Sequence, residues 1–310
     1  MPDAVRYVVG EGMETWRLLV DGPLDAAANM ACDEALLESM AAGVAPPTLR
    51  LYQWRPAALS LGRFQRSAAV DAAACARVGV SVVRRPSGGR ALLHDSELTY
   101  ALVAPAEHPR AGGATVLESY RRISLALAAG LQRLGAAVEL APARARRAEN
   151  RGQQMGDEGR KTAVDVPLSG RSQVSHAQQA EPGPLNGSAA CYDTAAGHEL
   201  TVAGRKLVGS AQARRRGALL QHGAIPLTGH ATRLGALLAD PPARLEARMI
   251  ALDEVLGRSV AADEVAAALA AGIAGCWGVR LVPGELTGAE RAAADRLRER
   301  YRDPAWTYGR

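Results

Sequence analysis

The length, composition and charge of the chain favour an ordinary globular enzyme. Its 310 residues are 48% hydrophobic and 22% charged, which is enough apolar material for a buried core. The net charge of +5 suits an acidic partner, but only 4% of the residues are aromatic, which disfavours a nucleic-acid-binding module that stacks bases. No signal-peptide pattern and no membrane-spanning apolar stretch is present, so we expect a cytoplasmic protein without a membrane partner.

The first third of the chain predicts a helix followed by two strands. Asp25–Gly43 keeps helical apolar spacing, begins at a residue that can cap a helix and ends at a glycine that can stop one. Thr48–Trp54 alternates like a strand. Arg55-Pro56 is typical of a turn, so Ala57–Gly62 is predicted as the return strand of a hairpin.

Shorter elements follow. The patterns predict a short helix at Asp71–Arg77, a β-branched strand at Val80–Arg84, a strand at Glu97–Val103 and a helix at Val116–Leu134. Residues 141–188 are polar and rich in Gly, Gln and Arg, which indicates a mobile insertion.

Regular patterns return after this insertion. The run ELTV, a turn at Ala203-Gly204 and the run KLVGSAQ predict a hairpin, and Gly217–Leu227 predicts a further strand. Residues 231–310 are mainly helical, with helices expected at Ala231–Leu238, Ala261–Ile273 and Ala289–Tyr301. Strands joined by short turns, with helices set apart, favour the α+β class: a mixed, largely antiparallel sheet with flanking helices, in a single catalytic domain spanning 1–310.

The segment RRPSGGRALLHD, residues 84–95, contains the first candidate site. Without side chains, Gly88 and Gly89 let backbone N–H groups approach a ligand closely. Arg85 and Arg90 flank this loop and could bind a phosphate or a phosphopantetheine arm, and His94 is a candidate base. The competing interpretation is a tight turn with exposed arginines and a histidine in a structural role.

The segment GRKLVGSAQARRRGALLQHGAIPL, residues 204–227, contains the second. Lys206 follows a turn and could point into a cleft, and the small residues Gly209, Ser210 and Ala211 indicate that a ligand or another backbone packs against them. His222 lies within an apolar strand, so it is either a satisfied core residue or part of a site. Residues 214–216, three arginines, predict a solvated hairpin tip or a docking patch for an acidic protein.

The four cysteines show no paired metal spacing, so no metal site is predicted. Cys32 and Cys75 lie within apolar helical patterns, where a buried structural thiol is expected. Cys191 lies in the run AACYDTAAGHEL, between the insertion and the predicted hairpin, where it would be accessible. Lys206 is a candidate cation that would favour its thiolate.

Together these segments resemble the biotin/lipoate protein ligase catalytic superfamily. The first is similar to the RRxxGGxxxxHD signature and the second to GxKxxGSAQ followed by LQHG. The run NMACDEALL at Asn29–Leu37 and the ending RYRDPAWTYGR also fit. Within the superfamily, a cysteine shortly before an EL…GRK run resembles the cysteine-dependent octanoyltransferases of the LipM type.

The resemblance implies an octanoyltransferase in lipoate biosynthesis that needs no cofactor. The donor would be octanoyl on acyl carrier protein, the carrier Cys191, and the acceptor a lysine of a lipoyl-domain protein such as the glycine cleavage H protein. Lys206 would stabilise the thiolate and help to shuttle protons, with desolvation lowering its own pKa. Backbone N–H groups near Gly88-Gly89 or Cys191 would stabilise the oxyanion.

Two related activities remain open at this point. An ATP-dependent lipoate ligase would make an acyl-adenylate and need no catalytic cysteine. An amidotransferase would use the same cysteine chemistry but take its octanoyl or lipoyl group from another lipoyl domain.

Overall fold

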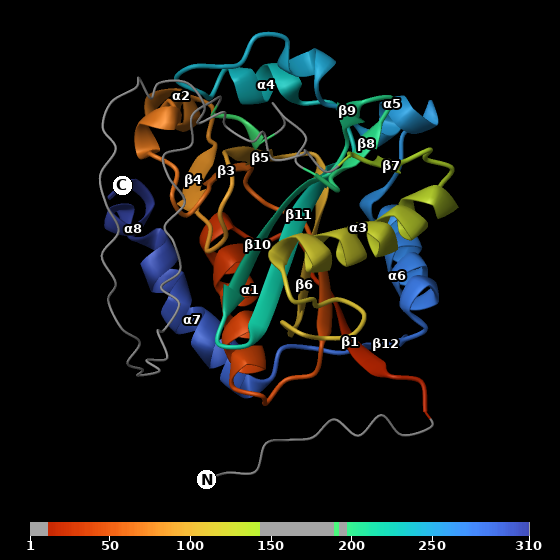
Figure 1. The fold of residues 1–310 in the computed structure, drawn as a ribbon. Coiled ribbons are helices and arrows are strands. Elements are labelled where there is room, and N and C mark those ends of the chain that lie inside the picture. The colour runs from red at the N-terminus through yellow and green to blue at the C-terminus, as the bar shows by residue number, and fades with distance from the viewer. Residues whose placement is uncertain (1–11, 143–188, 192–196, 310) are drawn as a thin grey trace, which may run out of the picture. The chain divides into compact units, whose positions relative to one another are not determined.

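The computed structural model has a six-stranded mixed sheet at its centre (Figure 1). The strands of this sheet are β1 (Thr15–Val20), β2 (Thr48–Tyr52), β6 (Glu97–Pro105), β10 (Gly209–Arg215), β11 (Ala218–Pro226) and β12 (Arg280–Pro283). Their order is β10-β11-β6-β2-β1-β12, with β10, β11, β6 and β2 antiparallel and β1 parallel to both of its neighbours. The predicted α+β class with a mixed, largely antiparallel sheet is confirmed.

Two small three-stranded sheets complete the β-structure. One contains β3 (Ala58–Leu61), β4 (Ser81–Arg84) and β5 (Leu92–His94), and the other contains β7 (Glu139–Leu140), β8 (Leu200–Val202) and β9 (Arg205–Lys206). The first holds the RRPSGGR loop between β4 and β5, and the second places Lys206. Both small sheets therefore position candidate site residues.

Helices cover both faces of the central sheet (Figure 1). The helices are α1 (Ala26–Ala41), α2 (Ala72–Arg77), α3 (Val116–Arg133), α4 (Ala231–Gly235), α5 (Leu252–Leu256), α6 (Ala262–Trp277), α7 (Gly288–Arg302) and α8 (Pro304–Tyr308), with 3-10 turns η1 (Ser67–Ala69) and η3 (Leu245–Ala247). Helices α3 and α6 pack on one face and α1 and α7 on the other.

Helix α1 is almost wholly buried between the sheet and α7. The Asp25 side chain accepts the Ala28 N–H at 2.7 Å, so this residue caps the helix as predicted. Many of the buried positions are alanines, which let the helix approach its neighbours closely. On the opposite face α3 and α6 approach through glycines, because a Cβ on Gly272 would lie 2.2 Å from the Gly130 nitrogen.

The predicted helices at Asp71–Arg77, Val116–Leu134 and Ala289–Tyr301 are confirmed, as is the strand at Gly217–Leu227. The strand predicted at 57–62 is confirmed as β3, but its predicted pairing as the return strand of β2 is wrong. β3 pairs with β4 and β5 instead of β2, and all four of its residues are buried, as expected of a strand inside a second sheet. Strands β1, β5, β7 and β12 were not predicted.

Two predictions in residues 199–217 also need correction. The run KLVGSAQ is not one strand: β9 ends at Lys206, whose backbone bonds Arg248 and Ile250, and Leu207 and Val208 cross the core to β10. The arginine run lies at the tip of the β10–β11 hairpin, where Arg216 is exposed, but its other two members are engaged with the protein. Arg214 donates to the Thr115 carbonyl at 2.7 Å, and Arg215 pairs with Glu34 at 2.8 Å.

The structure describes residues 12–142, 189–191 and 197–309, so nearly all of the predicted insertion lies outside the described residues. The described residues belong to one unit. The assignment of 1–310 to a single domain, of 141–188 to an insertion and of 231–310 to a helical part stays a prediction. Within the described part, no helix is both long and apolar enough to cross a membrane.

Candidate active site

The loop between β4 and β5 is braced from inside by Arg85. This buried guanidinium donates to the carbonyls of Gly88 and Arg90 at 2.8 Å and to the carbonyl and hydroxyl of Ser60 at 2.9 and 3.1 Å. Burial lowers the pKa of Arg85 to about 10, which leaves it a cation at neutral pH. The geometry therefore favours a loop-holding role for Arg85 over the predicted direct grip on a phosphate.

Glycines are required where this loop passes β3. A Cβ on Gly62 would lie 1.9 Å from the Gly89 carbonyl oxygen, and Gly89 itself adopts φ +92°, which disfavours any side chain. Gly88 faces open space, with no described atom within 4 Å of the point where a Cβ would lie. Gly89 is therefore needed for the backbone turn, whereas Gly88 leaves open space beside it.

The C-terminal run RYRDPAWTYGR, which is similar to the superfamily, is hydrogen-bonded to Arg84 at the start of the same loop. Arg84 donates to the carbonyls of Gly62 and Thr307 at 2.7 and 2.8 Å, and its own carbonyl accepts the Trp306 indole N–H at 2.9 Å. The buried Arg84 therefore connects α8 to Gly62, the residue that follows β3.

Cys191 is held beside the RRPSGGR loop by backbone pairing. Ala190 forms a parallel bridge with Ala91, and the Cys191 N–H donates to the Ala91 carbonyl at 2.8 Å. That N–H already has an acceptor, so in this arrangement it is not directed at an oxyanion. Cys191 is half-buried, whereas Cys32 and Cys75 are buried as predicted and Cys276 is exposed.

Lys206 reaches Cys191 from β9. Its Nζ lies 3.6 Å from the Cys191 sulfur and 2.9 Å from the Cys191 carbonyl oxygen, and it forms a 2.6 Å ion pair with Glu199. Burial alone lowers the pKa of Lys206, but Cys191 and Glu199 outweigh burial and raise it above its ordinary value. The predicted lowering of the Lys206 pKa is wrong, and Lys206 is a cation at neutral pH.

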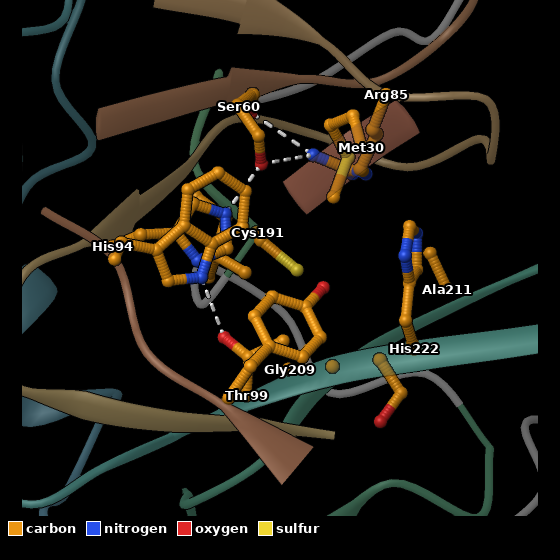
Figure 2. Close-up of a pocket in the computed structure, with 14 residues that line it drawn as sticks. Met30, Ser60, Arg85, His94, Thr99, Cys191, Gly209, Ala211 and His222 are labelled. Atoms are coloured by element: carbon orange, nitrogen blue, oxygen red, sulfur yellow. Dashed lines mark hydrogen bonds between the residues drawn. The ribbon is translucent and has the colours of Figure 1, made fainter. Parts of the chain in front are cut away.

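A small cavity lies against the Cys191 side chain (Figure 2). It is lined by large apolar side chains, a few polar groups and small residues on β10 and β11. Its lining consists of Met30, Tyr52, Trp54, Ser60, Arg85, Leu92, His94, Thr99, Cys191, Gly209, Ser210, Ala211, His222 and Gly223. We call it the Cys191 cavity.

The predicted small-residue stretch lies in this lining. Gly209, Ser210 and Ala211 all face the Cys191 cavity, and the Ser210 hydroxyl bonds Tyr100 at 2.7 Å. Gly223 opposite must remain a glycine, because a Cβ there would lie 2.5 Å from the Gly209 carbonyl oxygen. Of the other predicted site residues, Gly88, Gly89 and Arg90 are not part of the described lining.

His222 is held in place from both ends. Its Nδ1 lies 2.8 Å from Asp33, and its Nε2 lies 2.5 Å from the Ser87 hydroxyl. The Asp33 carboxylate can only accept, so Nδ1 donates, and the ring shares its second hydrogen bond with the Ser87 hydroxyl. His222 is thus buried and hydrogen-bonded, and its ring also lines the Cys191 cavity, so its predicted role in substrate binding stays a prediction.

His94 is fixed in a similar way. Its Nε2 bonds Ser60 at 2.8 Å, its Nδ1 bonds Glu97 at 2.5 Å, and its ring stacks on Trp54 with centroids 3.9 Å apart. Figure 2 shows this side chain beside the Cys191 cavity. Such full engagement favours the structural interpretation of His94 over the role of a free base.

Two site residues were missed from the sequence. Glu199 stands directly before β8 in the EL pair, and only its place in that quoted run could have drawn attention to it. Asp33 lies in the NMACDEALL run, where a buried acid on an apolar helix was the available signal. Among the described residues, no group of three or more His, Cys, Asp or Glu side chains is placed to hold a metal ion.

Known proteins share this architecture and sequence. Residues 25–274 match the lipoyl protein ligase A/B catalytic domain. A lipoate-protein ligase A bound with ATP superposes with a TM-score of 0.71 at 23% identity, covering 96% of this chain and 99% of that one. The lipoate protein ligase of Thermoplasma acidophilum gives a TM-score of 0.70 at 21% identity, with 96% and 97% covered. These structures share the fold.

Curated relatives are more similar in sequence. Octanoyltransferase LipM of Kyrpidia tusciae is 41% identical over 305 residues, covering 96% of this chain and 99% of the relative. Octanoyltransferase LipM of Moorella thermoacetica is 39% identical over 302 residues, covering 94% and 97%. The chain therefore belongs to the lipoyl protein ligase A/B catalytic domain family and, within it, to the LipM octanoyltransferases.

Proposed function

We propose that this octanoyltransferase carries its octanoyl group as a thioester on Cys191. The donor is the phosphopantetheine thioester of an acyl carrier protein, and the acceptor is a lysine of a lipoyl domain, such as that of the glycine cleavage H protein. The observation that carries the proposal is the 3.6 Å approach of the buried Lys206 ammonium to the Cys191 sulfur, at the opening of an apolar cavity.

The first half-reaction exchanges one thioester for another. The Cys191 thiolate attacks the acyl carbonyl carbon, a C–S bond forms to Cys191, and the donor's C–S bond breaks with its sulfur leaving as a thiolate. Both thioesters are of similar energy, so no ATP is required. Lys206 favours the attacking thiolate because its positive charge lies close to the sulfur.

The second half-reaction forms an amide. The neutral amine of the acceptor lysine attacks the thioester carbonyl, a C–N bond forms, and the C–S bond to Cys191 breaks. The sulfur leaves as a thiolate beside Lys206, and the surplus proton of the amine is released to solvent. The greater stability of the amide drives the overall transfer forward.

The Cys191 cavity suits the hydrocarbon part of the acyl group. Met30, Trp54 and Leu92 contribute apolar surface, while small residues on β10 and β11 leave space. Each CH₂ removed from water stabilises the bound chain by about 0.8 kcal/mol. The oxyanion of each tetrahedral intermediate is left to the Gly88-Gly89 amides, since the Cys191 amide is engaged elsewhere.

Lys206 acts here as a fixed charge and not as a proton shuttle. Its raised pKa means that it holds its proton at neutral pH, because the charges on Cys191 and Glu199 compensate for burial. This role replaces the expectation that desolvation would bring the lysine close to neutrality.

The direct test is mass spectrometry of the protein after incubation with octanoyl-acyl carrier protein. Wild type should gain one octanoyl group that hydroxylamine removes, and Cys191→Ser should gain no hydroxylamine-labile group. The absence of an adduct on wild type would overturn the covalent route.

The same assay separates the two related activities. An ATP-dependent ligase would release pyrophosphate when given lipoate, Mg²⁺ and ATP, and would tolerate Cys191→Ala. An amidotransferase would accept octanoylated H protein as donor in place of octanoyl-acyl carrier protein. We expect rapid adduct formation from the carrier protein only.

A further inference from the structure

Glu199 is the second charge that contacts Lys206. Its carboxylate, buried apart from 4% of its surface, lies 2.6 Å from the Lys206 Nζ. Glu199 immediately precedes β8, and β8 pairs with β9 so that Thr201 lies opposite Lys206. One small sheet thus fixes both members of the ion pair, and a short backbone connects them.

The acyl-enzyme cycle proposed above changes the charge on one side of Lys206 only. When Cys191 is a thiolate, the Lys206 ammonium has two anions within reach of its Nζ. When Cys191 carries an acyl group the sulfur is neutral, and Glu199 is then the carboxylate that remains at ion-pair distance. A buried ammonium without an anion tends to lose its proton, since burial penalises the charged form.

Among the residues that the structure describes, the tyrosines and the arginine next to the pair do not supply a further anion. The Tyr120 hydroxyl reaches Glu199 at 3.4 Å and is neutral, because burial raises its pKa well above the ordinary value. Tyr100 is likewise buried, and burial raises its pKa to about 12. Arg85 faces Cys191 from the loop, but it is a cation and bonds to backbone carbonyls.

We propose that Glu199 is a positioning residue for acyl transfer, whose carboxylate keeps Lys206 protonated and directed at the sulfur while Cys191 carries the acyl group. The inference rests on the acyl-Cys191 route proposed above. When the amide forms, the Lys206 ammonium is therefore already beside the Cys191 sulfur that leaves as a thiolate. Without Glu199, the second half-reaction is affected more than the first, because in the first the thiolate itself holds the ammonium.

The first test needs no acyl donor and uses Glu199→Gln, which keeps the shape and removes the charge. Cys191 is alkylated with iodoacetamide across a pH series, in a Cys276→Ser background that removes the exposed thiol. Removing one of two anions near Lys206 should favour the thiolate, so we expect the alkylation midpoint to fall by about one pH unit. An unchanged midpoint would show that Glu199 has no influence on the sulfur and would overturn the proposal.

The second test measures the acyl-enzyme at steady state. With octanoyl-acyl carrier protein and a lipoyl domain, Glu199→Gln should lower kcat about tenfold or more. The KM for octanoyl-acyl carrier protein should fall in proportion, because acylation is little affected, and most of the enzyme should carry octanoyl. Glu199→Asp, which keeps the charge, should recover part of kcat and return the alkylation midpoint towards that of wild type. A variant that turns over slowly with Cys191 unacylated would contradict the proposal.

The two tests distinguish the failure of Glu199 from the failure of the cysteine route. If wild type forms no thioester adduct, the proposed function falls whatever the alkylation midpoint of the variant. If wild type forms the adduct and Glu199→Gln behaves like wild type in both tests, only the role of Glu199 is lost. Should Glu199→Gln fail to fold, Glu199→Asp still decides, because a lengthened cation–carboxylate distance should also favour acyl-enzyme accumulation.

Discussion

Two buried clusters of charge in this protein differ in what they leave unsatisfied. The structural cluster (Asn29, Asp33, Arg50 and Tyr52) lies between α1 and β2, and the transfer cluster (Cys191, Glu199 and Lys206) lies beside the RRPSGGR loop. Both pair a carboxylate with a cation away from water. Only the second directs its cation at a nucleophile.

The structural cluster is saturated with hydrogen bonds. One Asp33 oxygen accepts from Arg50 at 2.8 Å, and the other accepts from Tyr52 and His222, each at 2.8 Å. Arg50 also donates to the Asn29 side chain at 2.9 Å. A set of partners this complete holds α1 to the sheet and leaves no donor directed at a substrate.

The transfer cluster has strong contacts on one side and a weak one on the other. Lys206 bonds Glu199 at 2.6 Å and the Cys191 carbonyl at 2.9 Å, while its contact with the sulfur is longer, at 3.6 Å. The sulfur can therefore be acylated without breaking the contacts that position the lysine. The comparison suggests a division of roles under the proposed mechanism: the saturated ion pair stabilises the fold, and the ion pair beside the acylated sulfur assists the transfer.

The largest expected effect is that of Cys191→Ser. The weaker nucleophile should lower turnover by on the order of 10³-fold or more, measured as octanoyl transfer to a lipoyl domain. Cys276→Ser is the matched control, because this thiol is exposed on α6 and does not line the cavity. Equal activity of the two variants would remove Cys191 from the chemistry.

Lys206→Met should follow, with a loss of about 10²–10³-fold in kcat, because a charge positioned for the transition state is removed. This variant also leaves Glu199 buried without its cation, so the thermal midpoint should fall. The double variant Lys206→Met/Glu199→Gln should regain stability without regaining turnover. Recovery of turnover in that double variant would show that Lys206 only neutralises Glu199.

Asp33→Asn should cost about 3 kcal/mol in the free energy of unfolding, since it breaks a buried ion pair on one side. Turnover per folded molecule should change far less than for Lys206→Met. Chemical denaturation followed by circular dichroism, with kcat measured on the folded fraction, checks both. A catalytic loss as large as that of Lys206→Met would erase the distinction between the clusters.

The stability difference between wild type and Asp33→Asn should also depend on pH. Burial raises the pKa of Asp33, but the hydrogen bond from His222 and the charge on Arg50 outweigh burial and hold it below the ordinary value of 3.8. The carboxylate therefore stabilises the fold fully above the unfolded value, and this contribution is lost as pH falls through the lower folded pKa. Denaturation at successively lower pH should show the two proteins converging.

The smallest effects are expected from a matched pair of tyrosine variants. Tyr52→Phe removes a 2.8 Å hydrogen bond to a buried carboxylate and should cost about 1.5–3 kcal/mol of stability. Tyr120→Phe removes a long 3.4 Å contact with Glu199 and should cost under about 0.5 kcal/mol. The reverse order, read from thermal midpoints, would mean that the transfer cluster is the more rigid of the two.

Much of the fold could be predicted locally. Asp25 capping α1, the α3 pattern and the long strand β11 all come from spacing within one element, where side chains interact with near neighbours. The hairpin predicted for β2 and β3 failed because pairing depends on burial over both faces of β3, which is a property of the packed core. Strand β9 ends at Lys206, earlier than predicted, for a similar reason. The backbone of Lys206 bonds residues 248 and 250, which are distant in the sequence.

The candidate site divides along the same line. Cys191, Lys206, Gly89 and the stretch Gly209–Ala211 could be named from the sequence, because their motifs are contiguous and each residue type suggests its chemistry. By contrast, the sequence predicted that Arg85 binds a phosphate or a phosphopantetheine arm, with an exposed arginine as the alternative. Only its hydrogen bonds to Ser60 and to the loop carbonyls show that it supports the loop from inside.

The sequence by itself determined the class of fold, the motifs and the candidate pair Cys191 and Lys206. The three-dimensional structure alone decided the charges around that pair. Asp33 meets His222 across 189 residues, and the ion pair of Glu199 with Lys206 sets the charge state of the lysine. The physical reason is that a pKa depends on which charges lie within a few ångströms and how much water is excluded, and folding sets both.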